Sequence, residues 1–306
     1  MKRSIWDLSV LGLTFTLIII CGLSSISAAA EDSGGYSVYT VGGLKIVRLL
    51  DMNGSLPADA LLGDREEIES LLPDGLCGGA IASYLFDTGN DVIMMDTGYG
   101  DLENGKMLEN LQKAGYNPDD VTMVVFTHLH GDHVGGAIKD RKPIFNKAMM
   151  IVPEKELVFW SDKVNNFSKA PAMLDYTFDL VEEFMSLYPG RIVTFKEGEA
   201  VVDWLKPIAV SGHTAGHTMF ELNYGNEKAF IWADIMHCPQ VQAANPEIAV
   251  VFDSDPNVAV QSRRKALDLV SDTGFVVFGE HFLSPGVLTF SKSADGGYQY
   301  SPVLPD

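Results

Sequence analysis

The sequence predicts an α/β protein in which two β-sheets lie face to face with helices on the outside. Short apolar or β-branched segments, typical of strands, alternate with segments whose apolar residues recur at helical spacing, and this succession occurs twice along the chain. All seven histidines follow residue 127, and six of them lie at or beside the ends of predicted strands. An α/β protein gathers its chemistry at such strand ends.

The first thirty residues differ from the rest. Lys2 and Arg3 precede a nearly continuous apolar run, residues 8–23, and three alanines end at residue 30. This layout is typical of a secretory signal peptide, so we expect an exported protein, periplasmic or secreted. An uncleaved N-terminal anchor is the alternative, because the run approaches spanning length. The remaining residues, 31–306, are enough for one large domain or two smaller ones, with no membrane span expected in the mature chain.

Composition excludes one class of partner. The net charge of −19 would repel nucleic-acid phosphates, while 46% apolar and 21% charged residues describe an ordinary globular chain. Beyond the signal peptide the chain has two cysteines, Cys77 and Cys238. They could pair in an exported protein, but sequence alone cannot place them within bonding distance.

The first half of the chain is predicted to form strands, followed by a helix, a strand and a further helix. A hairpin is expected over residues 36–50, around Gly42 and Gly43. The segment 163–173 shows no periodicity and could be a mobile loop, a cap or a solvated linker. The other predicted strands are 80–86, 91–95, 121–126 and 143–152, and the predicted helices are 64–72, 102–114, 154–162 and 174–188.

The second half returns to strands. We expect a helix over residues 258–269 and a last buried strand over residues 275–278. The preceding predicted strands are 191–195, 201–205, 208–211, 218–223 and 229–232. No internal repeat or low-complexity segment interrupts this order.

Residues 127–133 read Thr-His-Leu-His-Gly-Asp-His, directly after the predicted strand 121–126. In an extended chain alternate side chains leave on the same side, so His128 and His130 can converge on one ion. Asp132 and His133 can then serve a second ion after the chain bends at Gly131. A lone histidine is usually an ordinary core or surface residue, but three beside an aspartate within six positions indicate a metal site.

A two-ion site needs further ligands, which should lie at later strand ends. His213 and His217 stand among glycines after the strand 208–211, Asp234 closes the strand 229–232, and His281 follows the strand 275–278. Histidine-rich mixed ligation suits zinc, although iron or manganese could occupy a carboxylate-bridged pair.

The motif Thr127–His133, with Asp96-Thr-Gly upstream and Gly212-His-Thr-Ala-Gly-His217, Asp234 and His281 downstream, resembles the metallo-β-lactamase superfamily. The resemblance covers essentially the whole mature chain. It implies that residues 31–306 form a single domain, a four-layer αβ/βα sandwich of two mixed sheets with a dinuclear site along one edge. Ala215 departs from the family's usual proline, and Glu280 stands where a small residue is common.

Carried over by position, the resemblance implies roles for nine residues. Asp234 would bridge the two ions, His217 would not bind metal, and Asp96 would orient a ligand histidine from behind. The first ion would be held by His128, His130 and His213, and the second by Asp132, His133 and His281.

Residues near the predicted metal site indicate which branch of the superfamily the chain resembles most. Classical β-lactamases carry a cysteine where this chain has Asp234, and lactonases generally carry a tyrosine where it has His237. The segments 234–237, 252–256, 262–265 and 281–286 are most similar to the methyl parathion hydrolase branch. In that branch an aromatic near Trp160 lines the leaving-group pocket, so Trp160 is predicted as a pocket wall, with core packing as the alternative.

The expected function is an exported dinuclear metal-dependent hydrolase for a small ester, lactone or phosphotriester. Two divalent ions can lower the pKa of a shared water, and the resulting hydroxide would attack the substrate. Asp132 could also shuttle a proton, and His237 is the candidate for a group near the leaving atom, or else a core histidine. The alternatives are a β-lactamase-like amide hydrolase and a non-catalytic metal-binding module.

Overall fold

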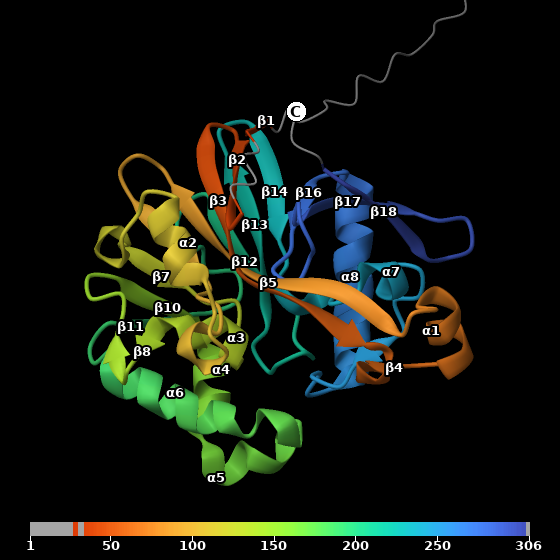
Figure 1. Cartoon of the computed structure of the whole chain (residues 1–306), viewed down its shortest axis with the longest axis horizontal. Coiled ribbons are helices and arrows are strands. Elements are labelled where there is room, and N and C mark those ends of the chain that lie inside the picture. Colours follow the sequence, from red (N-terminus) through yellow and green to blue (C-terminus); the bar gives the residue numbers. More distant parts are fainter. Residues whose placement is uncertain (1–26, 30–33, 304–306) are drawn as a thin grey trace, which may run out of the picture.

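The computed structural model describes residues 27–29 and 34–303 and shows two mixed β-sheets packed face to face (Figure 1). This confirms the predicted sandwich. The first sheet has eight strands, in the spatial order β1 (Ser27–Ala29), β2 (Tyr36–Val41), β3 (Leu44–Pro57), β5 (Leu76–Asp87), β6 (Val92–Met95), β7 (Met123–Val125), β10 (Met149–Pro153) and β11 (Ile192–Phe195). The second has six, β12 (Leu205–Ala209), β13 (Thr218–Tyr224), β14 (Glu227–Ile231), β16 (Val276–Phe278), β17 (Val287–Lys292) and β18 (Tyr298–Pro302).

Helices lie on the outer faces of both sheets (Figure 1). None of those described is long and apolar enough to cross a membrane. The α-helices are α1 (Arg65–Leu71), α2 (Met107–Lys113), α3 (Gly131–Val134), α4 (Glu154–Ser161), α5 (Lys163–Asn166), α6 (Tyr176–Leu187), α7 (Pro239–Gln242) and α8 (Pro256–Thr273). Two small two-stranded sheets, β4 (Leu61–Leu62) with β15 (Ala249–Val250) and β8 (Ile138–Lys139) with β9 (Lys142–Pro143), complete the chain.

Three apolar layers hold the sandwich together. The layer between the sheets includes Phe86 from β5 and Phe220 from β13, both fully buried. On the outer face of the first sheet, α6 packs through Phe184, and on that of the second, α8 packs through Leu267. Because each sheet is covered on both faces, its central strands are apolar throughout, which is why they were predictable as short apolar runs.

Residues at both ends of α8 determine where this helix begins and ends. The Asp255 side chain accepts a hydrogen bond from the Val258 N–H, and Pro256 occupies the first turn. Gly274 ends the helix with a φ of 67°, a left-handed conformation that glycine adopts readily. The helix therefore exceeds the predicted residues 258–269 at both ends.

The N-terminal hairpin was predicted to end near residue 50, but β3 continues to Pro57 and pairs with β5 along its whole length. A register shift between Leu50 and Met52 marks the start of this extension. The extended arm carries the first sheet across to α1 and β4, beside the second sheet (Figure 1). Consecutive residues of this arm, Asn53 to Ser55, are exposed, so no alternating apolar pattern marks it as a strand.

Further predictions differ from the structure, among them the strand 143–152, which is interrupted between β9 and β10, and the helix 102–114, which begins only at Met107. Residues 201–205 form only an isolated bridge, Val202 to Leu205, because the strand β12 begins at Leu205. The strand 275–278 is not the last one, since β17 and β18 follow it. The segment 163–173 consists of short helical turns, α5, Phe167–Lys169 and Ala172–Leu174.

The predicted signal peptide, residues 1–30, lies outside the described residues except for β1. This strand pairs antiparallel with β2 at the edge of the first sheet. Cleavage after residue 30 would therefore remove one edge strand.

Candidate metal centre

Strand direction brings the predicted site residues together. In the first sheet β6 and β7 run parallel, so the turns after them, which carry Asp96 and His128, lie at the same edge. In the second sheet β14 and β16 run parallel. The strand β13 is antiparallel to both β12 and β14, so β12 points the same way as β14. Their ends carry His213, Asp234 and His281. All these residues meet at one end of the sandwich.

The turn after β7 is held tightly. Asp96 accepts hydrogen bonds from the Thr127 N–H at 2.9 Å and from the Thr127 hydroxyl at 2.7 Å. The chain then enters α3, which carries Asp132 and His133. A Cβ on Gly131 would lie 2.4 Å from the Tyr176 hydroxyl oxygen, so a larger residue at this bend would displace the Tyr176 side chain.

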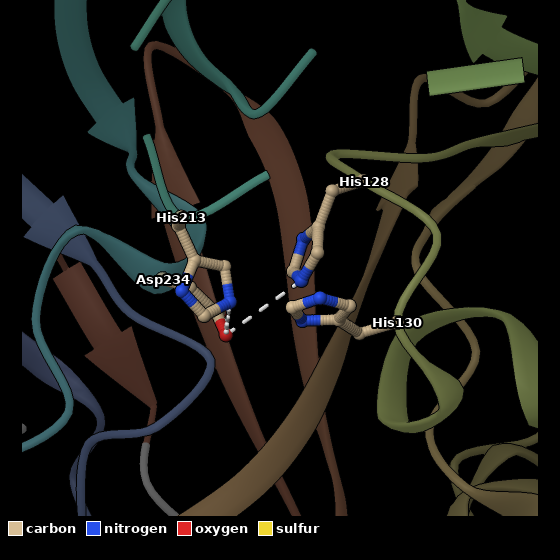
Figure 2. Close-up of side chains that lie close together, drawn as sticks. All are labelled: His128, His130, His213 and Asp234. Atoms are coloured by element: carbon tan, nitrogen blue, oxygen red, sulfur yellow. Dashed lines mark ion pairs between the residues drawn. The ribbon is translucent and has the colours of Figure 1, made fainter. Parts of the chain in front are cut away.

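The structure brings all seven predicted ligands into two groups that share Asp234. Within each group the ligand atoms lie within 4.8 Å of one another. The first group points inward from three separate turns (Figure 2). The groups are His128, His130, His213 and Asp234, and Asp132, His133, Asp234 and His281. They coincide with the two predicted ligand sets.

The donor atoms of the first group and of His133 fit a bound cation. Buried polar atoms normally find hydrogen-bond partners. Burial also lowers the pKa of His128 and of His130 well below the ordinary value, which keeps both rings neutral and able to ligate. Within the described part of the chain, five buried atoms of these residues have no hydrogen-bond partner: the Nε2 atoms of His128, His130, His133 and His213, and Oδ1 of Asp234.

The Nδ1 atom of four of the five candidate ligand histidines lies beside an oxygen. Such a contact fixes the tautomer and leaves the Nε2 lone pair toward the metal position. The Nδ1 contacts are His133 to Asp96 Oδ2 at 2.8 Å, His213 to Asp253 Oδ1 at 2.9 Å, His281 to the Ala80 carbonyl at 3.0 Å, and His128 to the Thr127 hydroxyl at 3.0 Å.

Two turns at the site have backbone conformations that residues with side chains rarely adopt. Asp96 has a φ of 55°, and Ala233, directly before Asp234, has a φ of 53°. Such conformations cost energy and persist where the surrounding contacts hold them. Here they direct the Asp96 carboxylate toward His133 and the Asp234 carboxylate into both ligand groups.

His217 lies outside both ligand groups, beside Asp234. Its Nε2 accepts a hydrogen bond from the Asp234 N–H at 3.0 Å, and its Nδ1 lies 3.1 Å from the Val210 carbonyl. Since Nε2 must accept, the proton is on Nδ1, and the ring is neutral. Burial, followed by the charge of His213, lowers the pKa of His217 to about 3, in agreement with this tautomer.

His237 lies three residues after Asp234 and joins the same cluster. Its Nε2 is 3.1 Å from Asp234 Oδ2, and its ring stacks on that of His281 with centroids 4.6 Å apart. The Gln242 side chain accepts from the backbone N–H of His237 and of Cys238, which fixes this turn. The position is compatible with the predicted place near a leaving atom.

A cavity of about 240 Å³ opens beside the ligands. Asp132, His237 and His281 form its polar end, and the extended β3–β5 arm forms one wall. Trp160 does not line it. The indole is 1% exposed, packs against His130 and Phe178, and donates its Nε1–H to Glu156, so it supports His130 from within the core.

Sequence reasoning missed two residues that support the site. Asp253 holds His213 and also accepts from the Val250 N–H at 3.0 Å. Glu156 is fully buried in α4, and its carboxylate accepts from the backbone N–H groups of Leu129 and Gly216, one beside each histidine motif. Only the packed structure brings these carboxylates to their partners. Asp253 lies in the segment 252–256, whose similarity to the methyl parathion hydrolase branch indicated the branch but no role for this carboxylate.

The two cysteines form a disulfide, with Cα atoms 5.9 Å apart. Cys238 follows His237 directly, and Cys77 lies in β5 shortly before Gly79 and Ala80, which line the cavity. The bond therefore ties the arm on one side of the cavity to the turn that carries His237.

Comparison with known proteins agrees with this geometry. Residues 78–281 match the profile of the metallo-beta-lactamase superfamily. The structure is similar to that of AbOPH, a hydrolase in the beta lactamase superfamily, with 28% identity and a TM-score of 0.82 over 88% of this chain and 98% of that one. It is also similar to the structure of AidC, a dizinc quorum-quenching lactonase in complex with a homoserine product, with 25% identity and a TM-score of 0.81. This match again covers 88% of this chain and 98% of the other. The N-acyl homoserine lactonase AiiA of Bacillus thuringiensis subsp. kurstaki is 22% identical, covering 74% of this chain and 91% of its own.

Proposed function

This chain belongs to the metallo-β-lactamase superfamily and is a metal-dependent hydrolase, and we propose that it uses two zinc ions to open small lactones that carry an apolar arm. The observation that carries the proposal is the pair of ligand groups that share Asp234 at the polar end of a small cavity.

The ligand groups support two ions. One carboxylate belonging to both groups suits a bridging role, and the His-rich mixed donor set suits zinc. AidC, similar over nearly its whole length, is a dizinc enzyme. Metal analysis of protein purified without added ions tests this; one ion per chain, or iron or manganese in place of zinc, would contradict it.

The residues of the chain supply the rest of the mechanism. When bound, the two ions would lower the pKa of a water molecule and polarise the scissile carbonyl. Asp132 lies 3.5 Å from His281 Nε2 and faces the cavity with its side chain 15% exposed, so it can take up and release a proton. His237 holds its ring at the cavity wall, where it can stabilise the leaving oxygen.

The cavity supports a small substrate with an apolar arm. Its volume lies just below the range usual for sites of drug-sized ligands, and Leu56, Ile81 and Phe252 give it apolar walls. Both AidC and AiiA are named as lactonases, and the product bound to AidC is an acylated homoserine. We therefore place N-acyl homoserine lactones first among candidate substrates, ahead of aryl esters and phosphotriesters.

A substrate panel tests this order. The zinc-loaded protein should hydrolyse an N-acyl homoserine lactone with a higher kcat/KM than an aryl acetate, a paraoxon-like triester or nitrocefin. Preference for the triester would favour the methyl parathion hydrolase branch, and preference for nitrocefin would favour a β-lactamase-like amide hydrolase. Turnover of none of the four would contradict the proposal.

We also propose that the protein is exported. The pattern of residues 1–30 is that of a signal peptide, and the Cys77–Cys238 disulfide belongs to an oxidising compartment. Expression of the full chain in a bacterium, followed by fractionation and mass measurement of the N-terminus, tests this. A cytoplasmic product that retains residues 1–30 and free thiols would contradict it.

A further inference from the structure

We propose that the hydroxyl of Tyr99 binds a hydrogen-bond acceptor on the substrate arm, next to the scissile bond, and so makes the enzyme selective for acylamino lactones over alkyl lactones. The inference rests on the proposed lactonase function and assigns a recognition role to a residue outside both ligand groups. Tyr99 lines the cavity together with Asp132.

The hydroxyl of Tyr99 is free to meet a ligand. The residue is half-buried, and its hydroxyl has no hydrogen-bond partner among the described residues. A phenol keeps its proton near neutral pH, so the Tyr99 hydroxyl can donate. The cavity walls are otherwise mostly apolar beyond the ligand cluster, with Ser55 on the β3 arm as the other hydroxyl.

The backbone of Tyr99 is fixed to the metal centre. Its N–H donates to Asp51 Oδ2 at 2.8 Å, and Asp51 is fully buried. Thr97, two residues earlier, donates both its N–H and its hydroxyl to the His133 carbonyl at 2.8 Å. A Cβ on Gly135 would lie 2.5 Å from the Tyr99 carbonyl oxygen, which shows how closely this loop packs on the turn after α3.

A donor held in this way can discriminate between substrates whose arm carries a hydrogen-bond acceptor and substrates whose arm does not. A rigid, partly buried donor loses its water when an arm fills the cavity, and an arm without an acceptor leaves it unpaired. An amide carbonyl beside a lactone ring supplies the acceptor, whereas an alkyl chain at the same carbon does not. Tyr99 lines the cavity together with Asp132, and Thr97, two residues earlier, is bonded to the His133 carbonyl, so the phenol belongs to the end of the cavity that holds the reacting group rather than to the tip of the arm.

Tyr176 provides a matched control. Its phenol also lies beside the metal motif, close to Gly131, and Asp132 contributes to raising its pKa after burial. Tyr176 does not line the cavity. Removal of its hydroxyl therefore changes the surroundings of Asp132 without removing a cavity donor.

The test compares Tyr99→Phe, Tyr176→Phe and Ser55→Ala on an N-acyl homoserine lactone and on a γ-butyrolactone that carries an alkyl chain of equal length. Tyr99→Phe should lower kcat/KM for the acylamino lactone about tenfold or more and change the alkyl lactone less than about twofold. Tyr176→Phe should change neither, Ser55→Ala should leave the preference between the two lactones unchanged, and zinc content should be equal in all four proteins.

A binding measurement separates recognition from turnover. An N-acyl cyclopentylamide keeps the amide and the arm but has no ester to cleave, and its Kd by calorimetry should rise about tenfold in Tyr99→Phe only. Equal losses on both lactones, an unchanged Kd, or a loss of preference in Ser55→Ala instead would overturn the inference. If the wild type hydrolyses neither lactone, the proposed function fails, and the Kd comparison still decides whether Tyr99 recognises the amide.

Discussion

The two halves of the candidate metal centre are built in different ways. Four of the seven candidate ligands come from one stretch, residues 128–133, between β7 and the end of α3. The other three, His213, Asp234 and His281, follow three different strands of the second sheet and meet only because those strands point the same way. Chain connectivity positions the first set, and tertiary structure positions the second.

The supporting contacts differ accordingly. In the first set Asp96 holds both Thr127 and His133, so one carboxylate orients most of the stretch. In the second set each residue has a partner of its own: Asp253 for His213, the Ala80 carbonyl for His281, and His217 for the backbone of Asp234. Glu156 reaches both halves through the N–H groups of Leu129 and Gly216; apart from it, the contiguous motif shares one carboxylate, whereas each dispersed ligand has a support of its own.

Asp234 joins the two halves, so its removal should have the largest effect. We expect Asp234→Ala to lower kcat/KM for any substrate more than about a thousandfold and to reduce bound metal below two ions per chain, because both groups lose a ligand. Asp132→Ala removes a ligand from one group only and should retain one ion. Elemental analysis with circular dichroism as a folding control measures both; two ions retained by folded Asp234→Ala protein would show that the halves are independent.

Replacement of the supporting carboxylates should have the next largest effect and should distinguish the halves. Loss of such a partner typically costs about 10- to 100-fold in metal affinity. Asp253→Asn should weaken one ion only, because Asp253 orients His213 alone among the ligands. Asp96→Asn should weaken both ions, since Thr127 leads directly into His128. Chelator competition resolves the two affinities, and an identical pattern for both variants would contradict the shared-support idea.

His217 should make the second half sensitive to acid in the metal-free protein. Its pKa is lowered in the folded state to about 3 from an ordinary value of 6.5, so the unfolded chain binds the extra proton first. The stabilising contribution is therefore complete above about pH 6.5 and is lost as the pH falls toward 3, by about 1.4 kcal/mol per pH unit. His217→Gln should reduce this slope in urea unfolding between pH 4 and 7. An unchanged slope would assign the acid sensitivity to other groups.

The smallest effect should come from Ala215→Pro, which restores the residue usual in this family. The structure shows no hydrogen bond from the Ala215 N–H, whereas its carbonyl accepts from Ser211 at 3.0 Å and would be kept. A proline that loses no donor stabilises through the unfolded chain, by about 0.4 to 1 kcal/mol. Thermal unfolding measures this, and marked destabilisation would mean that the turn before His217 cannot accept the proline ring.

The sequence was sufficient for the first half of the site because its signal is local. Residues 127–133 concentrate unusual residue types after an apolar strand, and spacing alone separates His128 and His130 from Asp132 and His133. For His213, Asp234 and His281 the strand ends gave candidates, and the family resemblance supplied the grouping that the structure reproduces.

What the sequence could not provide depends on packing between distant segments. Trp160 follows the first motif closely, yet its indole turns into the core, because Glu156 one helical turn earlier accepts its Nε1–H. The strand β18 lies at a sheet edge and the extension of β3 lines the cavity, so both carry weaker patterns. The Cys77–Cys238 pairing joins residues 161 positions apart, a distance over which sequence spacing carries no geometric information.

The Cys77–Cys238 disulfide also restricts the conformations of the unfolded, oxidised chain. The disulfide closes a ring that contains every candidate ligand except His281. Closing a loop of this length removes about 5 kcal/mol of conformational entropy from the unfolded state, on the chain-entropy account of cross-links. The effective concentration of the dispersed residues His213 and Asp234 near the contiguous motif is therefore raised even in the unfolded oxidised chain. His281 is the one ligand that must arrive from outside the ring.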